Sequence, residues 1–195
     1  SIAMMRRVLN MWELEGPEAA DGIEGGCARV NLGRAVLRDD KPQDAITIVC
    51  PGVHALVRHL GESHGEVAWA RNALGAAYRH ADEPELCLRV LQAALPVLEA
   101  SFGPQHREVP PALTGVGWAL IQLGRPQEAI PYLEHALLIM PDARGDDLPK
   151  GQQGIKSARE LLEDAKAAIR VGAFAQLQNG TEELAASQHG VDELA

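Results

Sequence analysis

The sequence predicts an all-α protein, a right-handed α-solenoid of antiparallel helix pairs closed by a C-terminal capping helix. The main observation is that the same residues recur at a fixed interval of 42 residues, without a gap. The recurring positions are Gly33/Gly75/Gly117, Pro42/Pro84/Pro126, Gly61/Gly103, His64/His106 and Val67/Val109. A period of this length is typical of solenoids, in which each unit stacks on its neighbours to bury a shared core. Such an architecture favours an extended binding surface over a catalytic pocket.

The composition supports packed helices and excludes some classes of partner. Hydrophobic residues make up 46% of the 195 residues, but aromatic residues only 4%. The core must therefore consist of Leu, Ala, Val and Ile, and small aliphatic side chains suit close helix packing better than a sheet sandwich. The formal net charge of −9 disfavours binding to nucleic acid or to an anionic membrane, because both require a basic surface.

Cysteine usage and hydropathy predict a cytoplasmic protein. The three cysteines, Cys27, Cys50 and Cys87, form no CxxC pair, so we interpret them as reduced thiols. The sequence contains neither a secretory signal peptide nor an apolar run of about 18 residues, which is the length that a membrane-spanning helix requires.

Glycine and proline divide the chain into helix–turn–helix units. Residues 109–123 are apolar with helical spacing, Gly124-Arg125-Pro126 interrupts them, and 127–140 start a second helix. By the same reasoning, Pro51-Gly52 should kink or fray the second helix of the first repeat. The expected units are a half-repeat over 2–15 and repeats over 20–60, 61–102 and 103–141. Because the half-repeat has no first helix, we expect the chain to be part of a longer protein.

A terminal helix is expected to close the array. Residues 153–172 are amphipathic, and their apolar positions fall on one stripe, formed by Ile155, Ala158, Leu161, Leu162, Ala165 and Ile169. This helix would cover the apolar edge of the last repeat, as a terminal cap must. The predicted solenoid thus spans 1–178, and 179–195 form a polar C-terminal tail.

The third repeat resembles the tetratricopeptide repeat in the kind and spacing of its residues. It has small residues at the close helix crossing, an inward alanine, a bulky apolar residue facing it and a proline at the end. The matching residues are Gly117, Gly124, Ala129, Leu133, Ala136 and Pro141. The second repeat departs from this pattern, because Cys87 replaces the inward alanine and Asp82 replaces the turn glycine.

The long period makes the array similar to the repeats of kinesin light chains. The segments GESHGEVAWARNALGAAY and GPQHREVPPALTGVGWAL carry this resemblance, and GRPQEAIPYLEHAL resembles repeats of bacterial signalling proteins. The resemblance covers residues 26–141. It implies a non-catalytic protein–protein interaction module that belongs to a larger bacterial regulatory protein.

The resemblance also implies that the first helix of each repeat lines a concave groove. The groove candidates are Arg34, Arg38, Trp69, Asn72, Arg79, His80, Thr114, Trp118 and Gln122. Asn72 occupies a position where the family often has an asparagine that holds a peptide backbone, for which the side-chain amide has both a donor and an acceptor. The three arginines form a positive strip, which favours an acidic peptide or a C-terminal carboxylate.

Each groove candidate has a structural alternative. Trp69 and Trp118 could pack between helices, the arginines could be solvated charges, and Asn72 could cap or bridge helices. Thr114 replaces asparagine in the third repeat, which weakens a continuous clamp.

Catalytic and cofactor sites find little support in the sequence. His64 and His106 occupy equivalent positions before a helix and are expected to cap it, while Cys87 is expected in the core. No phosphate-binding glycine loop is present, and we expect no metal or cofactor. Two other functions stay open: self-assembly as a homodimer through the terminal helices, and a small-molecule or peptide sensor.

Overall fold

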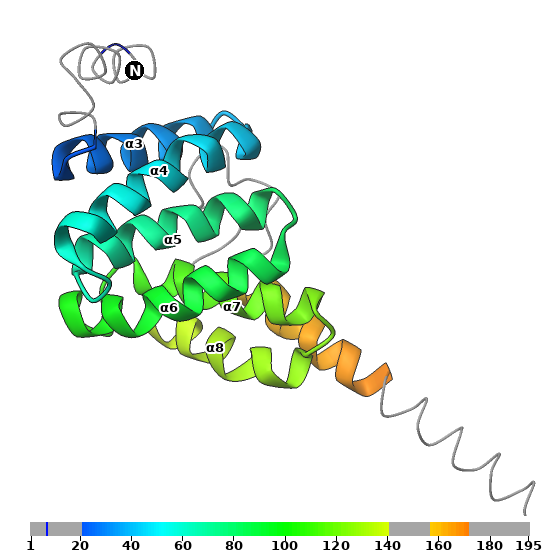
Figure 1. Ribbon diagram of the computed structural model, residues 1–195. Coiled ribbons are helices and arrows are strands. Elements are labelled where there is room, and N and C mark those ends of the chain that lie inside the picture. The colour runs from blue at the N-terminus through cyan, green and yellow to red at the C-terminus, as the bar shows by residue number, and fades with distance from the viewer. Residues whose placement is uncertain (1–6, 8–20, 141–156, 172–195) are drawn as a thin grey trace, which may run out of the picture.

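The chain folds into antiparallel helix pairs that stack along one axis (Figure 1). The computed structural model describes residue 7 and residues 21–140 and 157–171. The first helices of the pairs are α3 (Ile23–Leu37), α5 (Gly65–His80) and α7 (Val109–Gln122), and the second helices are α4 (Pro42–Leu60), α6 (Pro84–Phe102) and α8 (Pro126–Ile139). A further helix follows over 158–171. The predicted all-α solenoid of antiparallel helix pairs is confirmed.

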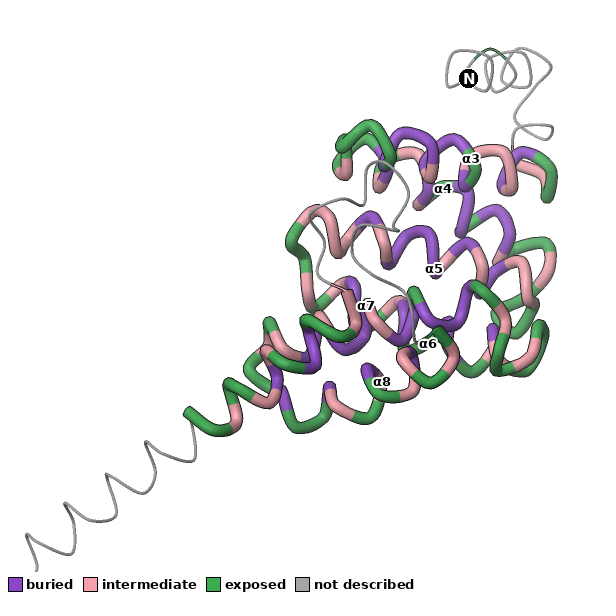
Figure 2. Tube along the Cα trace, turned by 180° about the vertical axis from the view of Figure 1, so that it is seen from behind, coloured by how far each residue is buried: buried purple, intermediate pink, exposed green. Residues whose placement is uncertain are grey.

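The first helices form an inner layer. Helix α5 contacts both α3 and α7, whereas the described second helices contact only helices adjacent in the chain. Closer approach on one side of a stack makes that side the concave one. The inner-layer helices also carry more buried residues than the outer ones (Figure 2). We therefore define the inner layer as α3, α5 and α7.

The repeat period is visible in the backbone of the turn that connects the two helices of each pair. The second helices begin with Pro42, Pro84 and Pro126, where a missing N–H costs nothing because the first turn has no intrahelical acceptor for it. The residues two positions earlier have left-handed backbone, with φ of 58° at Asp40, 58° at Asp82 and 72° at Gly124. Aspartate tolerates this conformation better than most residues do, which explains how Asp82 can replace the turn glycine.

Helix α4 continues through Pro51 without a break. The expected fraying at Pro51-Gly52 is therefore wrong. Gly52 is buried against α3, where an added β-carbon would lie 2.8 Å from the backbone oxygen of Gly26. Close packing on α3 accordingly supports the helix on the side of Gly52, and Pro51 lies exposed.

Each helix pair crosses at a glycine of its inner helix. A β-carbon added at Gly33, Gly75 or Gly117 would meet Val49, Leu91 or Leu133 at 2.1, 2.4 or 2.5 Å. These partners also recur at intervals of 42 residues. The inward position one turn before them is filled by the small residues Ala45, Cys87 and Ala129, all fully buried.

The expected capping helix is confirmed over the part that is described. Leu161, Leu162 and Ala165 are buried, and the two leucines belong to the same apolar cluster as residues of α7 and α8. Ser157 and Glu160 form a capping box: the Ser157 N–H donates to Glu160 Oε2 at 2.6 Å, and the Glu160 N–H donates to Ser157 Oγ at 3.4 Å.

Several expectations concern residues outside the described part of the chain. These are the half-repeat over 2–15 apart from Arg7, Pro141 at the end of the third repeat, residues 153–156 and 172 of the capping helix, and the tail over 179–195. They stay predictions.

Gly75→Ala tests the close crossing. On an exposed helix this substitution stabilises by up to about 1 kcal/mol. Here we expect it to lower the free energy of unfolding by about 1–3 kcal/mol, because Leu91 is confined between Gly75 and Gly115, at 2.4 Å from an added β-carbon on either side. Urea denaturation followed by circular dichroism measures the change. A gain in stability would contradict the crossing.

Candidate functional site

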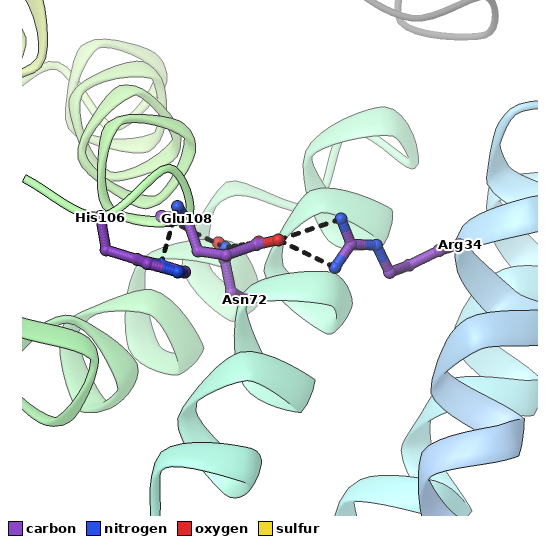
Figure 3. Close-up of polar contacts among 4 residues, drawn as sticks. All are labelled: Arg34, Asn72, His106 and Glu108. Carbon is purple, nitrogen blue, oxygen red and sulfur yellow. Dashed lines mark hydrogen bonds and ion pairs between the residues drawn. The ribbon is translucent and has the colours of Figure 1, made fainter. Parts of the chain in front are cut away.

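A buried carboxylate connects the three helices of the inner layer (Figure 3). Glu108 lies at the N-terminus of α7 and is only 7% exposed. Its Oε1 accepts hydrogen bonds from both terminal nitrogens of Arg34 on α3, each at 3.2 Å. Asn72 on α5 donates from Nδ2 to Glu108 Oε2 at 2.9 Å and to the Glu108 backbone oxygen at 3.1 Å. We call Arg34, Asn72 and Glu108 the inner triad.

Local structure places Glu108 at this position. The Glu108 N–H donates to Nδ1 of His106 at 3.4 Å, which fixes the backbone just before α7. The equivalent bond at the start of α5 runs from the Glu66 N–H to His64 Nδ1 at 3.1 Å. The expected capping role is thus confirmed for His64, which is the N-cap residue of α5, whereas the N-cap residue of α7 is Glu108 and His106 binds its N–H from outside the helix. A carboxylate at a helix N-terminus is also favoured by the helix dipole.

Trp69 supports the guanidinium of Arg34. The guanidinium carbon lies 5.5 Å from the centre of the indole ring, a distance at which a cation is attracted to the face of an aromatic ring. Trp69 itself packs against the apolar cluster formed by α3, α4 and α5. The side chain of Arg34 is 40% exposed, compared with 10% for that of Glu108. Arg34 therefore links the buried carboxylate to the surface of the inner layer.

Asn72 bridges α5 and the start of α7, which is one of the roles that the sequence left open for it. The side chain is 5% exposed, and its amide is bound to Glu108 rather than directed to solvent. A peptide could use this amide only if Glu108 moved.

The other predicted groove residues lie apart from the inner triad. Arg38 and Gln122 are exposed, and Trp118 packs against the apolar cluster of α6, α7 and α8. Thr114 donates from Oγ1 to the Pro110 carbonyl of its own helix at 2.8 Å. The structure therefore brings together Arg34, Trp69 and Asn72.

Arg79 and His80 lie at the C-terminal end of α5. Burial lowers the pKa of Arg79 to about 10, so the guanidinium is still charged at neutral pH. Burial, assisted by the charge of Arg79, lowers the pKa of His80. Neutral imidazole is therefore the favoured form of His80 at pH 7, so the positive charge of the groove candidates comes from the three arginines.

Glu108 is the residue that sequence analysis missed. The available signal was the shared motif His-x-Glu-Val, which places Glu66 and Glu108 in register. That motif does not reveal which glutamate is buried, because the contact with Arg34 joins residues 74 positions apart.

Catalytic chemistry has no support among the described residues. Cys87 is fully buried, and burial raises the pKa of its thiol to about 12 even though Arg79 acts in the opposite direction. The thiolate, which is the nucleophilic form, is thus suppressed. In the described ranges, no group of three or more His, Cys, Asp and Glu side chains could hold a metal ion. None of the helices described is both long and apolar enough to cross a membrane.

Comparisons with known proteins agree with this architecture. Residues 55–142 match the family model of the tetratricopeptide repeat. No curated protein matches the sequence.

Three solved structures are similar to the chain. One is a variant of a kinesin light chain-like protein of Podosopora anserina with nearly identical TPR-like repeats: identity is 17%, coverage is 95% of this chain and 84% of that one, and the TM-score is 0.65. Another structure of such repeats from Podosopora anserina has 16% identity, coverage of 86% and 84%, and a TM-score of 0.60. BtubC (BKLC) from P. vanneervenii has 17% identity, coverage of 91% and 73%, and a TM-score of 0.56. At these identities the similarity establishes the fold alone.

Glu108→Ala tests the inner triad. We expect it to lower the free energy of unfolding by about 2–3 kcal/mol, because it removes Oε2, which is the side-chain acceptor of the buried Asn72 amide, and the carboxylate that pairs with Arg34. The matched control is Glu66→Ala in the preceding repeat, where the carboxylate accepts only a long bond of 3.9 Å from the Cys27 thiol. Glu66→Ala should lower the free energy of unfolding by less than about 1 kcal/mol. Equal losses, measured by urea denaturation, would contradict the assignment.

Proposed function

The chain carries tetratricopeptide repeats, and we propose that its inner layer binds an acidic peptide of a partner protein. Such repeats are generally protein–protein interaction modules without catalytic function. The observation that carries the proposal is the guanidinium of Arg34. It is held in position by Glu108 and Trp69 while 40% of its side chain stays exposed.

Preorganisation makes Arg34 a suitable anchor for an acid. A long side chain loses conformational entropy when it is fixed by a ligand, and a side chain already fixed by the protein avoids much of this loss. Guanidinium also offers a planar set of donors that matches a carboxylate. We place the acidic group of the peptide, or its C-terminal carboxylate, at Arg34.

The remaining groove candidates extend this proposal along the inner layer. Arg38 is exposed one turn beyond Arg34 and would meet a second acidic group. Trp118 is partly exposed on α7 and Gln122 is exposed at its end, so they would contact the rest of the peptide. Arg79, His80 and Thr114 complete the proposed surface. We also propose a cytoplasmic setting within a bacterial regulatory protein.

The test is selection of peptides from a random display library by the intact chain. We expect the selected peptides to be rich in Asp and Glu and to bind less well as salt screens the charges. Arg34→Ala should weaken the binding of a selected peptide by about tenfold or more. Fluorescence anisotropy gives the dissociation constants, and circular dichroism verifies that each variant is helical.

Arg58→Ala is the matched control. Arg58 is also an exposed arginine that pairs with an acidic residue, Asp21, at 3.3 Å, but it lies on the outer helix α4. Its substitution should leave peptide affinity unchanged. Selected peptides without acidic residues, or equal losses in both variants, would contradict the proposal.

A further inference from the structure

The inner triad is a departure from the repeat, not a requirement of it. Glu66 occupies the position of Glu108 one repeat earlier, and Val30 occupies the position of Asn72. Val30 is fully buried in an apolar cluster, and Glu66 accepts a bond from the Cys27 thiol instead of from an amide and a guanidinium. The α3–α5 interface therefore stacks without the polar contacts that join α5 to α7.

A buried carboxylate has an energetic cost that an apolar residue avoids. Moving a carboxylate out of water is unfavourable, and its hydrogen bonds only offset this cost. In the preceding interface the equivalent carboxylate, Glu66, is only partly buried and has the apolar Val30 in place of an asparagine partner, so stacking alone does not account for the buried and fully bonded carboxylate of Glu108. The geometry around its carboxylate instead describes a receptor: two N–H groups of Arg34 on one oxygen and the amide of Asn72 on the other.

This receptor holds the same chemical group that we assigned to the partner, a carboxylate. We infer that Glu108 is a resident carboxylate, which competes with a carboxylate of the partner peptide for Arg34 and Asn72. The inference rests on the proposed function and specifies how the site works. Peptide binding is then an exchange of one carboxylate for another.

The difference in exposure among the three residues of the inner triad determines the order of steps in the exchange. Arg34 is the accessible member of the triad, whereas Asn72 and Glu108 are covered. An incoming carboxylate reaches the guanidinium first, and the amide of Asn72 becomes available once the side chain of Glu108 turns away. Contact with Trp69 keeps Arg34 in place during this step. The exchange also releases the connection between α3 and α7.

The experiment measures binding of fluorescein-labelled hexaglutamate to the full chain by anisotropy, with hexaglutamine as the control peptide. Glu108→Gln keeps the size and one acceptor of the side chain but removes its charge. We expect this variant to bind hexaglutamate about tenfold more tightly than the wild type does, because the internal competitor is gone. Glu66→Gln should leave the affinity unchanged, and Arg34→Gln added to Glu108→Gln should abolish the gain.

The outcomes separate the two proposals. If the wild type binds hexaglutamate and Glu108→Gln, verified as helical, binds it no more tightly, the competition is wrong while the proposed function stands. If neither protein binds hexaglutamate, an acidic peptide is the wrong ligand class and both proposals fall.

A second measurement uses the unaltered protein and so does not depend on how the variant folds. In NMR spectra, hexaglutamate should shift the side-chain amide signals of Asn72, because that amide changes partners, together with the backbone amide of Glu108, because the side chain of the same residue turns away. A shift at Arg34 that leaves Asn72 and Glu108 unchanged would overturn the exchange.

Discussion

The close approach of the two helices in each pair depends on a glycine of the inner helix, which has no β-carbon. At Gly33, Gly75 and Gly117 the facing Val49, Leu91 and Leu133 occupy the space that a β-carbon would need. This contact fixes how closely the two helices approach, and its spacing of 42 residues fixes the relation of one pair to the next. Among the helices that the structure describes, α5 touches both α3 and α7 while the outer helices do not touch one another, so polar side chains from α3, α5 and α7 can meet.

The inner triad places polar and charged groups in an architecture that is otherwise held together by apolar contacts. Leucine, valine and alanine fill the interfaces between helices, and buried charge is rare because it must be compensated by nearby hydrogen bonds. Glu108 is compensated from two different helices. The same contacts keep Arg34 fixed at the accessible surface. Structural compensation and the ligand recognition that we propose therefore depend on the same side chains.

The fold was largely predictable from the sequence, because its signals are local or periodic. Pro84 and Pro126 mark helix starts, the glycine series marks the crossings, and His64 could be assigned as a cap. Even the capping helix followed from its apolar stripe, although its capping box at Ser157 and Glu160 was overlooked. The uninterrupted passage of α4 through Pro51 was not predictable, since it depends on packing against α3.

The site was less predictable, because its contacts are long-range. Register placed Arg34, Trp69 and Asn72 on inner helices, and the structure brings these three together. Register could not indicate that Glu108 lies between Arg34 and Asn72, since that contact depends on how α7 crosses α5 and on how far the side chain of Arg34 extends across α5. A repeat of 42 residues describes what the units share, whereas the inner triad arises from what differs between them.

A double-mutant cycle on Arg34 and Glu108 tests the central claim most directly. The free energies of unfolding of the wild type, Arg34→Met, Glu108→Gln and the double variant give the coupling energy between the two side chains. If the carboxylate holds α3 to α7 as described, the coupling is about 1 kcal/mol or more. Additive effects, within about 0.3 kcal/mol, would show that the two residues do not interact in solution and would contradict the account.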